Sequence, residues 1–255
     1  MSDFTADYKG ATVTPSPNHG ERADVSGPDM IILHYTGMGT ADSALAWLCN
    51  AESQVSSHYF VFEDGRVMQL VPEELRAWHA GKSVWDGAVD INSRSIGIEI
   101  ANAGHPAALP EFPKVQIDAV IELCRDCGVR WSIAPERVLG HSDIAPVRKI
   151  DPGEKFPWDT LSQHGVGHWV PSAPIGGGRF FQRGDSGQPV EAIQSMLSLY
   201  GYGIEITGHY CEKTEGVVAA FQRHFRPSLV DGIADVSTID TLHRLIGALP
   251  KFRSV

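Results

Sequence analysis

The segment Val138–Trp158 combines three residue types that can do chemistry together. His141 follows a short apolar run, Lys149 comes eight residues later, and Asp151 lies two residues beyond the lysine. Imidazole nitrogens and carboxylate oxygens are good ligands for zinc, and a lysine beside them adds a positive charge. Pro146 and Pro152 restrict the backbone around these residues, because proline fixes its own φ and limits the residue before it. We therefore expect a stiff loop that holds two metal ligands.

Two further candidates lie on predicted strands elsewhere in the chain. The apolar run Met30–Leu33 predicts a buried strand that ends in His34. In Ser95–Asn102, isoleucines alternate with mostly small residues, so Glu99 projects from the face opposite the isoleucines. A carboxylate on such a face indicates the floor of a cleft. Taken alone, this stretch fits an exposed strand glutamate equally well.

Together these five residues form a complete set for hydrolysis. Three protein ligands leave the fourth position of a zinc ion open to water, whose pKa the metal lowers to about 7. A nearby carboxylate can take the proton of that water and return it to a leaving amine. A lysine can hold the developing oxyanion together with the metal. The residue types therefore favour a metal-dependent hydrolase.

Composition excludes several other classes of function. The chain has 255 residues and a formal net charge of −10, which disfavours nucleic acid and anionic membrane surfaces as partners. The hydrophobic share of 42% is ordinary for a globular protein. No apolar stretch approaches the ~18 residues of a membrane span, so we expect none. The acidic start MSDFTADYKG has no apolar core of a secretory signal, which favours the cytoplasm.

The elements that position these residues alternate between strands and helices through residues 30–160, which predicts an α/β domain around a mixed sheet. An Asp-Gly turn between Tyr59–Phe62 and Val67–Val71 predicts a hairpin. Pro113–Cys127 has the apolar spacing of a helix, and Gly128 is expected to end it. The fold class expected is thus a mixed central β-sheet flanked by helices.

The pattern changes after a segment rich in glycine and proline at residues 164–179, which is typical of a linker. Amphipathic spacing then predicts helices at Pro189–Tyr200 and Thr214–Phe225, and Ser237 is placed to cap a third. These elements predict a small three-helix bundle. Its histidines, His224 among them, are expected on the surface.

The motifs resemble those of bacterial N-acetylmuramoyl-L-alanine amidases of the AmpD and AmiD type. The resemblance rests on GHSDIAPVRKIDPG, with IILH before it and SIGIEIAN between them. It extends to SPNHGER, SSHYFVFEDG and RAWHAG, and so covers most of residues 12–160. The spacing from histidine to lysine to aspartate, with Pro-Gly after Asp151, makes it specific.

The resemblance implies one zinc ion per chain, with ligands at His34, His141 and Asp151. It also implies that Glu99 is the acid/base and that Lys149 stabilises the oxyanion. The implied reaction is hydrolysis of the amide between the lactyl group of N-acetylmuramic acid and L-alanine of the stem peptide. The substrate would be peptidoglycan or (anhydro)muropeptides in cell-wall turnover or recycling. Residues in or beside these motifs are candidates for substrate binding: Tyr35, His58, Trp78 and His79.

Residues 180–250 resemble the peptidoglycan-binding repeat through RGDSGQPVEAIQ, LYGY, AAFQRHF and DGIADVST. Such a module would tether the enzyme to cell wall or to longer muropeptides. Members with this module carry an export or lipid signal, whereas cytosolic recycling members usually lack it. The module points to the periplasm or cell envelope and the N-terminus to the cytoplasm, so both compartments stay open.

We accordingly divide the chain into four parts. Residues 1–28 are an N-terminal arm that packs on the catalytic domain, and residues 29–163 are that catalytic domain. Residues 164–179 are the linker, and residues 180–255 are the peptidoglycan-binding bundle.

Two alternatives belong to other classes of protein. A non-catalytic peptidoglycan recognition protein would have the same fold, but such relatives characteristically lose a zinc ligand. A structural zinc site usually has four protein ligands rich in cysteine, and no fourth ligand stands out. The sequence leaves open the form of the sugar, the stem peptide that is read and the oligomeric state.

Overall fold

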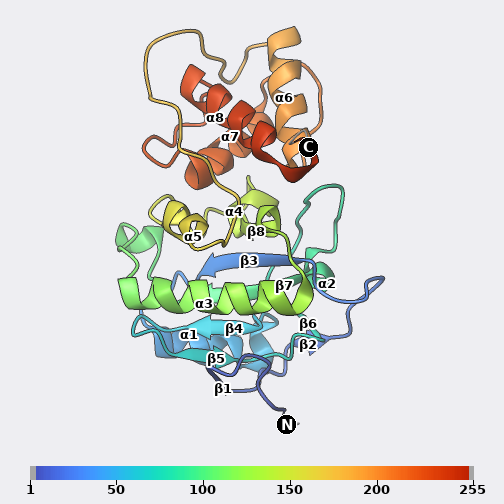
Figure 1. The fold of residues 1–255 in the computed structure, drawn as a ribbon, viewed down its shortest axis with the longest axis vertical. Coiled ribbons are helices and arrows are strands. Elements are labelled where there is room, and N and C mark those ends of the chain that lie inside the picture. The colour runs from blue at the N-terminus through green and yellow to red at the C-terminus, as the bar shows by residue number, and fades with distance from the viewer. Residues whose placement is uncertain (1–3, 253–255) are drawn as a thin grey trace.

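A six-stranded mixed sheet forms the centre of the first two thirds of the chain, in the order β1-β5-β4-β7-β3-β8 (Figure 1). The computed structural model describes residues 4–252. The strands are β1 (Ala11–Val13), β3 (Met30–Tyr35), β4 (Tyr59–Val61), β5 (Val67–Gln69), β7 (Ser95–Ile100) and β8 (Val138–Gly140). β4, β7, β3 and β8 run parallel, and β4 and β5 form the predicted antiparallel hairpin. The predicted α/β class with a mixed sheet is therefore confirmed.

The N-terminal arm adds one strand to this sheet and one to a second, smaller sheet. β1 pairs with β5, and β2 (His19–Gly20) pairs with β6 (Arg76–Ala77) in a separate two-stranded ladder. The Asp7 carboxylate accepts from the side chain of Gln69 and from the backbone N–H of Glu73. These contacts join the arm to the strands that lie farthest from β8.

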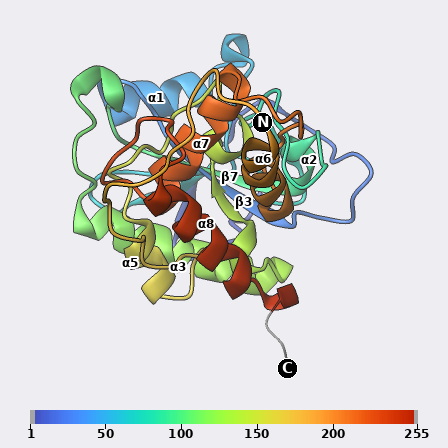
Figure 2. The same cartoon turned by 90° about the horizontal axis from the view of Figure 1, so that it is seen from above.

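Two helices cover opposite faces of the sheet (Figures 1 and 2). α3 (Lys114–Trp131) packs on the face that carries the isoleucines of β7, all of which are fully buried. α1 (Ala41–Leu48) packs on the other face against Phe60 and Phe62, and Thr40 caps its first turn. The face of β7 that carries Glu99 is thus the face of α1, which leaves room for a cleft beside that helix.

Short helical elements complete this part of the chain. They are α2 (Ile91–Arg94), α4 (His141–Ile144), α5 (Trp158–Gln163) and the 3₁₀ turns Ala51–Ser53, His105–Ala107 and Pro135–Arg137. The segment after β8, expected to be a loop, thus begins with a helical turn. The carboxylate of Asp143 accepts from the backbone N–H of Gly140 and so caps that turn.

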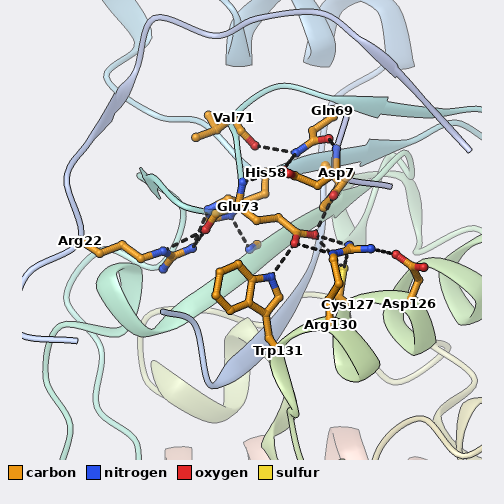
Figure 3. Close-up of polar contacts among 12 residues, drawn as sticks. Asp7, Arg22, His58, Gln69, Val71, Glu73, Asp126, Cys127, Arg130 and Trp131 are labelled. Carbon is orange, nitrogen blue, oxygen red and sulfur yellow. Dashed lines mark hydrogen bonds and ion pairs between the residues drawn. The ribbon is translucent and has the colours of Figure 1, made fainter. Parts of the chain in front are cut away.

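The prediction that α3 ends at Gly128 is wrong, because the helix continues to Trp131. A glycine inside a helix costs about 1 kcal/mol relative to alanine. Two side chains of the extra turn offset that cost by binding Glu73 (Figure 3). The Arg130 guanidinium donates to Glu73 Oε1 at 2.7 Å, and the Trp131 indole N–H donates to Oε2 at 2.5 Å. Tertiary contacts therefore decide where this helix ends.

Glu73 is a buried carboxylate, with a side chain that is 1% exposed. Besides Arg130 and Trp131, the Tyr59 hydroxyl and the Cys127 thiol donate to it. Burial alone would raise the pKa of Glu73, but the hydrogen bonds from Arg130 and the other donors outweigh burial and lower it. Glu73 is therefore ionised in the folded protein at neutral pH.

Replacing Glu73 by glutamine is expected to lower the free energy of unfolding at pH 7 by about 2–4 kcal/mol, because it breaks a largely buried ion pair. A carboxyl whose pKa is lower in the folded state stabilises the protein above its unfolded pKa of about 4.3. That contribution disappears as the pH falls through the folded pKa, so the difference between variant and parent should shrink below about pH 4. Urea unfolding of parent and variant at pH 7 and at pH 3 measures this difference in the free energy of unfolding.

The neighbouring Glu74 is exposed and provides the matched control. Glu74→Gln should change the free energy of unfolding by less than about 0.5 kcal/mol at either pH. A cost for Glu73→Gln that stays the same from pH 7 to pH 3 would show that the charge of Glu73 does not stabilise the fold.

The C-terminal helices lie beyond β8, at the opposite end of the molecule from β1 (Figure 1). They are α6 (Gln188–Tyr200), α7 (Glu212–Phe225) and α8 (Val236–Ala248), followed by the turn Pro250–Phe252. Asp235, rather than the expected Ser237, caps α8 by accepting from the backbone N–H of Thr238. Within residues 4–252 no helix has the length and hydropathy to cross a membrane.

Residues 164–179 contain no helix or strand, yet the parts on either side of them share one hydrophobic core. Ile32, Leu139 and Ile144 belong to the same buried cluster as Val217 and Phe221 of α7. The C-terminal helices are therefore joined to the sheet by packing as well as by the chain between them, because they cover apolar surface beside β8 and α4.

Candidate active site

The register of the parallel strands brings the candidate residues to one edge of the sheet. His34 on β3 lies directly beside Glu99 on β7, so the two side chains share a face. Leu33 pairs with Gly140 of β8, which places His141 immediately beyond the same edge. Ligand sites of open α/β sheets lie at such carboxyl ends of strands.

Three ligand atoms converge at this edge. His34 Nδ1 lies 2.9 Å from His141 Nδ1 and 3.2 Å from Asp151 Oδ2, and the latter two atoms are 3.0 Å apart. All three residues are buried. The backbone N–H of Ser142 donates to the carbonyl of Asp151 at 2.9 Å, which ties the end of the loop back to α4.

The partners of Nε2 in His34 and His141 indicate which nitrogen of each ring carries the proton. His141 Nε2 lies 3.1 Å from the carbonyl of Ala80, which can only accept, so Nε2 carries the proton. His34 Nε2 lies 3.0 Å from His79 Nδ1. His79 Nε2 in turn contacts the Ser95 hydroxyl at 3.2 Å. These contacts are all satisfied if the Nε2 atoms of His34, His79 and His141 each carry the proton and donate it. The Nδ1 atoms of His34 and His141 are then unprotonated and can bind a cation.

The charges of this group suit a cation. Burial lowers the pKa of His34 to about 4, and the proximity of His141 contributes to the same shift, so His34 is neutral at pH 7. Burial raises the pKa of Asp151, but the two imidazoles outweigh it and hold that pKa well below its usual value. In the tautomers that could bind a metal both Nδ1 atoms are unprotonated, and the two nitrogens and the carboxylate would then repel one another without a cation among them. Ligand atoms of a tetrahedral zinc ion lie about 3.3 Å apart, so the group can hold a metal.

A cavity of about 420 Å³ opens in front of the three ligands. Glu99 and Lys149 line it together with them, and Trp47 and Leu48 of α1 form an apolar wall. Burial raises the pKa of Glu99 well above its usual value, the charge of Asp151 raises it further, and Lys149 opposes both. Glu99 Oε2 is buried and has no hydrogen-bond partner within the described part of the chain. A buried polar atom without a partner on a cavity wall is suited to contact a substrate or water.

Comparison with known proteins shows the family of this chain. The family described as N-acetylmuramoyl-L-alanine amidase matches residues 24–154. AmiD, the N-acetylmuramoyl-L-alanine amidase of Escherichia coli, is 40% identical over 224 residues, which are 82% of this chain and 79% of AmiD. The chain belongs to the N-acetylmuramoyl-L-alanine amidase family. Residues 186–242 of this amidase also match a putative peptidoglycan binding domain.

Other relatives match this amidase over different lengths. The 1,6-anhydro-N-acetylmuramyl-L-alanine amidase AmpD of E. coli is 31% identical over 58% of this chain and 88% of its own. E. coli AmiD, solved with anhydro-N-acetylmuramic acid-L-Ala-D-gamma-Glu-L-Lys as substrate, superposes with a TM-score of 0.72 at 36% identity, covering 89% of this chain and 92% of AmiD. AmpDh3 of Pseudomonas aeruginosa superposes with a TM-score of 0.71 at 30% identity, covering 97% of this chain and 100% of AmpDh3.

The structure separates the four candidates for substrate binding. Tyr35, Trp78 and His79 line the cavity of this amidase, whereas His58 does not. His58 is fully buried, accepts from the backbone N–H of Gly97 at 2.9 Å and lies 3.0 Å from the carbonyl of Leu75. Its ring therefore joins the sheet to the loop after β5, and this placement does not support the predicted contact with substrate.

His79 has a further role beyond lining the cavity. Its two nitrogens face His34 and Ser95, and its ring lies against Gly97, where an added Cβ would approach the ring to 2.4 Å. The glycine that the sequence pattern treats as a small strand residue thus makes room for His79. The ring holds the imidazole of His34, and both of its nitrogens already have partners.

Sequence reasoning missed the residues that hold the ligand loop from outside. Arg148 donates to the carbonyls of Ala80 and Lys82 at 2.7 and 2.9 Å. His224, expected on the surface, is 2% exposed and binds Asp143. Neither contact has a local sequence signal, because each joins segments more than sixty residues apart.

Proposed function

We propose that this amidase is zinc-dependent and hydrolyses the amide between the lactyl group of N-acetylmuramic acid and L-alanine of the stem peptide. The observation that carries the proposal is the convergence of three buried ligand atoms beside Glu99 and Lys149 in one cavity. Relatives solved with related molecules support it: AmiD with its anhydromuropeptide substrate and AmpDh3 with anhydromuramic pentapeptide. The proposed substrates are peptidoglycan and (anhydro)muropeptides in cell-wall turnover or recycling.

One zinc ion per chain would be held by His34 and His141 through Nδ1 and by Asp151 through Oδ2. When bound, zinc polarises a carbonyl group and makes water acidic enough to react near neutral pH. The protein contributes fixed orientation: the carbonyl of Ala80 holds His141, and His79 holds His34. Outer partners of this kind set the tautomer and direction of a ligating imidazole.

Glu99 moves the proton in the proposed reaction. Its raised pKa lies closer to neutrality than that of an ordinary glutamate, as general acid–base catalysis requires. As a carboxylate it accepts a proton from the attacking water while the new C–O bond forms. It then gives that proton to the nitrogen of L-alanine as the C–N bond breaks, so the stem peptide leaves as a free amine.

Lys149 stabilises the negative charge that develops on the carbonyl oxygen. Its side chain lines the same cavity, and its charge is close enough to affect the pKa values of both Glu99 and His34. A cation aimed at a developing oxyanion lowers the barrier because it acts mainly in the transition state. Tyr35 and Trp78, on the cavity wall, would contact the rest of the substrate.

The parts of the chain divide the work. Residues 29–163, with the arm 1–28 packed on them, carry out hydrolysis, and residues 180–255, after the linker 164–179, bind the wall. The match to a peptidoglycan binding domain supports association with the cell wall. The match to AmiD extends over 82% of this chain and the match to AmpD over 58%, which supports an arrangement like that of AmiD.

Product analysis tests this function. Incubation of the protein with intact sacculi, and in parallel with purified anhydro-muropeptide, should release stem peptides that begin with a free L-alanine amine. Mass spectrometry should show a gain of one water across the lactyl–alanine bond and no cleavage of the glycan. The same protein treated with a chelator is the control. Binding to sacculi with no release of peptide would instead identify a recognition protein.

A further inference from the structure

Asp143 is a fully buried carboxylate that no step of the proposed reaction uses. It lies two residues after the ligand His141, on α4. Three donors surround it at 2.7 Å: the backbone N–H of Gly140, the Tyr202 hydroxyl and His224 Nδ1. A buried carboxylate is costly unless it is paired and hydrogen-bonded. Two of its three donors belong to the C-terminal region.

His224 is held in a single orientation. Its ring stacks on Trp158, with centroids 3.7 Å apart, and on Phe225, with centroids 3.8 Å apart. Nδ1 must carry the proton, because the Asp143 carboxylate can only accept. Trp158 lies at the end of the segment that contains Asp151. His224 thus contacts residues near both ends of segment 141–158, which carries His141 and Asp151.

Tyr202 approaches Asp143 from the other direction. Its ring packs edge-on against Trp85, with centroids 5.0 Å apart. The backbone N–H of Asp86 donates to the carbonyl of Gly201, and the backbone N–H of Val84 donates to the carbonyl of Ile144. Residues 84–86, between β6 and β7, therefore bind both α4 and the residue that precedes Tyr202.

We propose that Tyr202 and His224 are positioning residues of the active site: through Asp143 they fix α4 and the loop that carries His141 and Asp151. The C-terminal region is then a structural part of the metal site as well as the wall-binding part. The inference rests on the proposed zinc-dependent function. Losing an outer partner of a metal ligand typically weakens metal affinity about 10–100-fold, and this cluster acts through the backbone of the ligand segment.

Variants of the full chain separate the donor from the packing. Tyr202→Phe removes one hydroxyl, and His224→Phe keeps a stacking ring while it removes the Nδ1 donor. Each should weaken the zinc affinity of the folded protein about 10-fold or more, measured by competition with a chelator. Turnover of a soluble muropeptide should fall in kcat with little change in KM. His224→Asn, which retains a donor near the position of Nδ1, should recover much of the zinc affinity.

Tyr200→Phe is the matched control. The ring of Tyr200 stacks on that of Tyr202, but its hydroxyl binds His168 and not Asp143. The zinc affinity of this control should equal that of the parent, as should the binding of every variant to insoluble wall. If the Tyr202 and His224 variants lose thermal stability but keep parental zinc affinity, the contact is only structural and the inference is wrong. If the His224 variants do not fold, Tyr202→Phe alone decides. A parent protein that binds no zinc would overturn the proposed function instead.

Discussion

Replacing His34, His141 or Asp151 by alanine is expected to remove both the metal and the turnover. Three protein ligands are the minimum that catalytic zinc sites use, and the remaining two would hold the ion weakly. The parent should contain about one zinc per chain, and a chelator should abolish activity reversibly. Metal content by elemental analysis and turnover of a muropeptide, measured on the same samples, test this expectation.

The control for the ligand variants is His164→Ala. His164 is exposed and lies on the segment after α5, outside the cavity, so its loss should affect neither zinc content nor rate. Zinc added back should restore the chelated parent and should not restore the ligand variants. Full activity in a protein shown to be free of metal would contradict the proposal.

Replacing Glu99 by glutamine is expected to lower kcat by about 10²–10⁴-fold, the usual contribution of a general acid–base group. The variant should fold and keep zinc, because Glu99 is not one of the three converging ligands and its Oε2 makes no hydrogen bond within residues 4–252. The amide has the same shape as the carboxylate but cannot carry the proton. Single-turnover rates and zinc content of the same preparation measure the effect.

Lys149→Met is the comparison for Glu99→Gln. It keeps most of the side-chain stem and removes the charge, and losing one oxyanion-stabilising group costs about 10²–10³-fold in kcat. Both variants should change kcat more than KM, because the interactions form mainly in the transition state. Near-normal kcat in zinc-loaded Glu99→Gln would mean that another residue is the base. His79 is poorly placed to replace it, since both of its nitrogens have partners.

Much of this protein could be predicted from short stretches of sequence. The alternation of Ser95–Ile100 predicted the face on which Glu99 lies, and the apolar run before His34 predicted its place at a strand end. The family is confirmed, because its motifs are local and specific. The roles of the five site residues stay predictions, although the structure brings all five to one cavity.

Other features depend on contacts between distant segments, which no local pattern records. Gly128 predicts the end of a helix, but Glu73, more than fifty residues earlier, binds the turn beyond it. His58 and His79 have similar aromatic neighbours in sequence, yet His58 is enclosed by backbone groups and His79 contacts the imidazole of His34.

The largest difference between the sequence prediction and the structure concerns the linker and the C-terminal helices. Glycine and proline at residues 164–179 predict separate parts, and the segment does lack helix and strand. Whether two amphipathic surfaces join is decided by their shape and by the pairing of buried polar groups. Only the tertiary structure places His224 and Tyr202 on Asp143, where each donor satisfies a carboxylate that could not otherwise be buried beside His141.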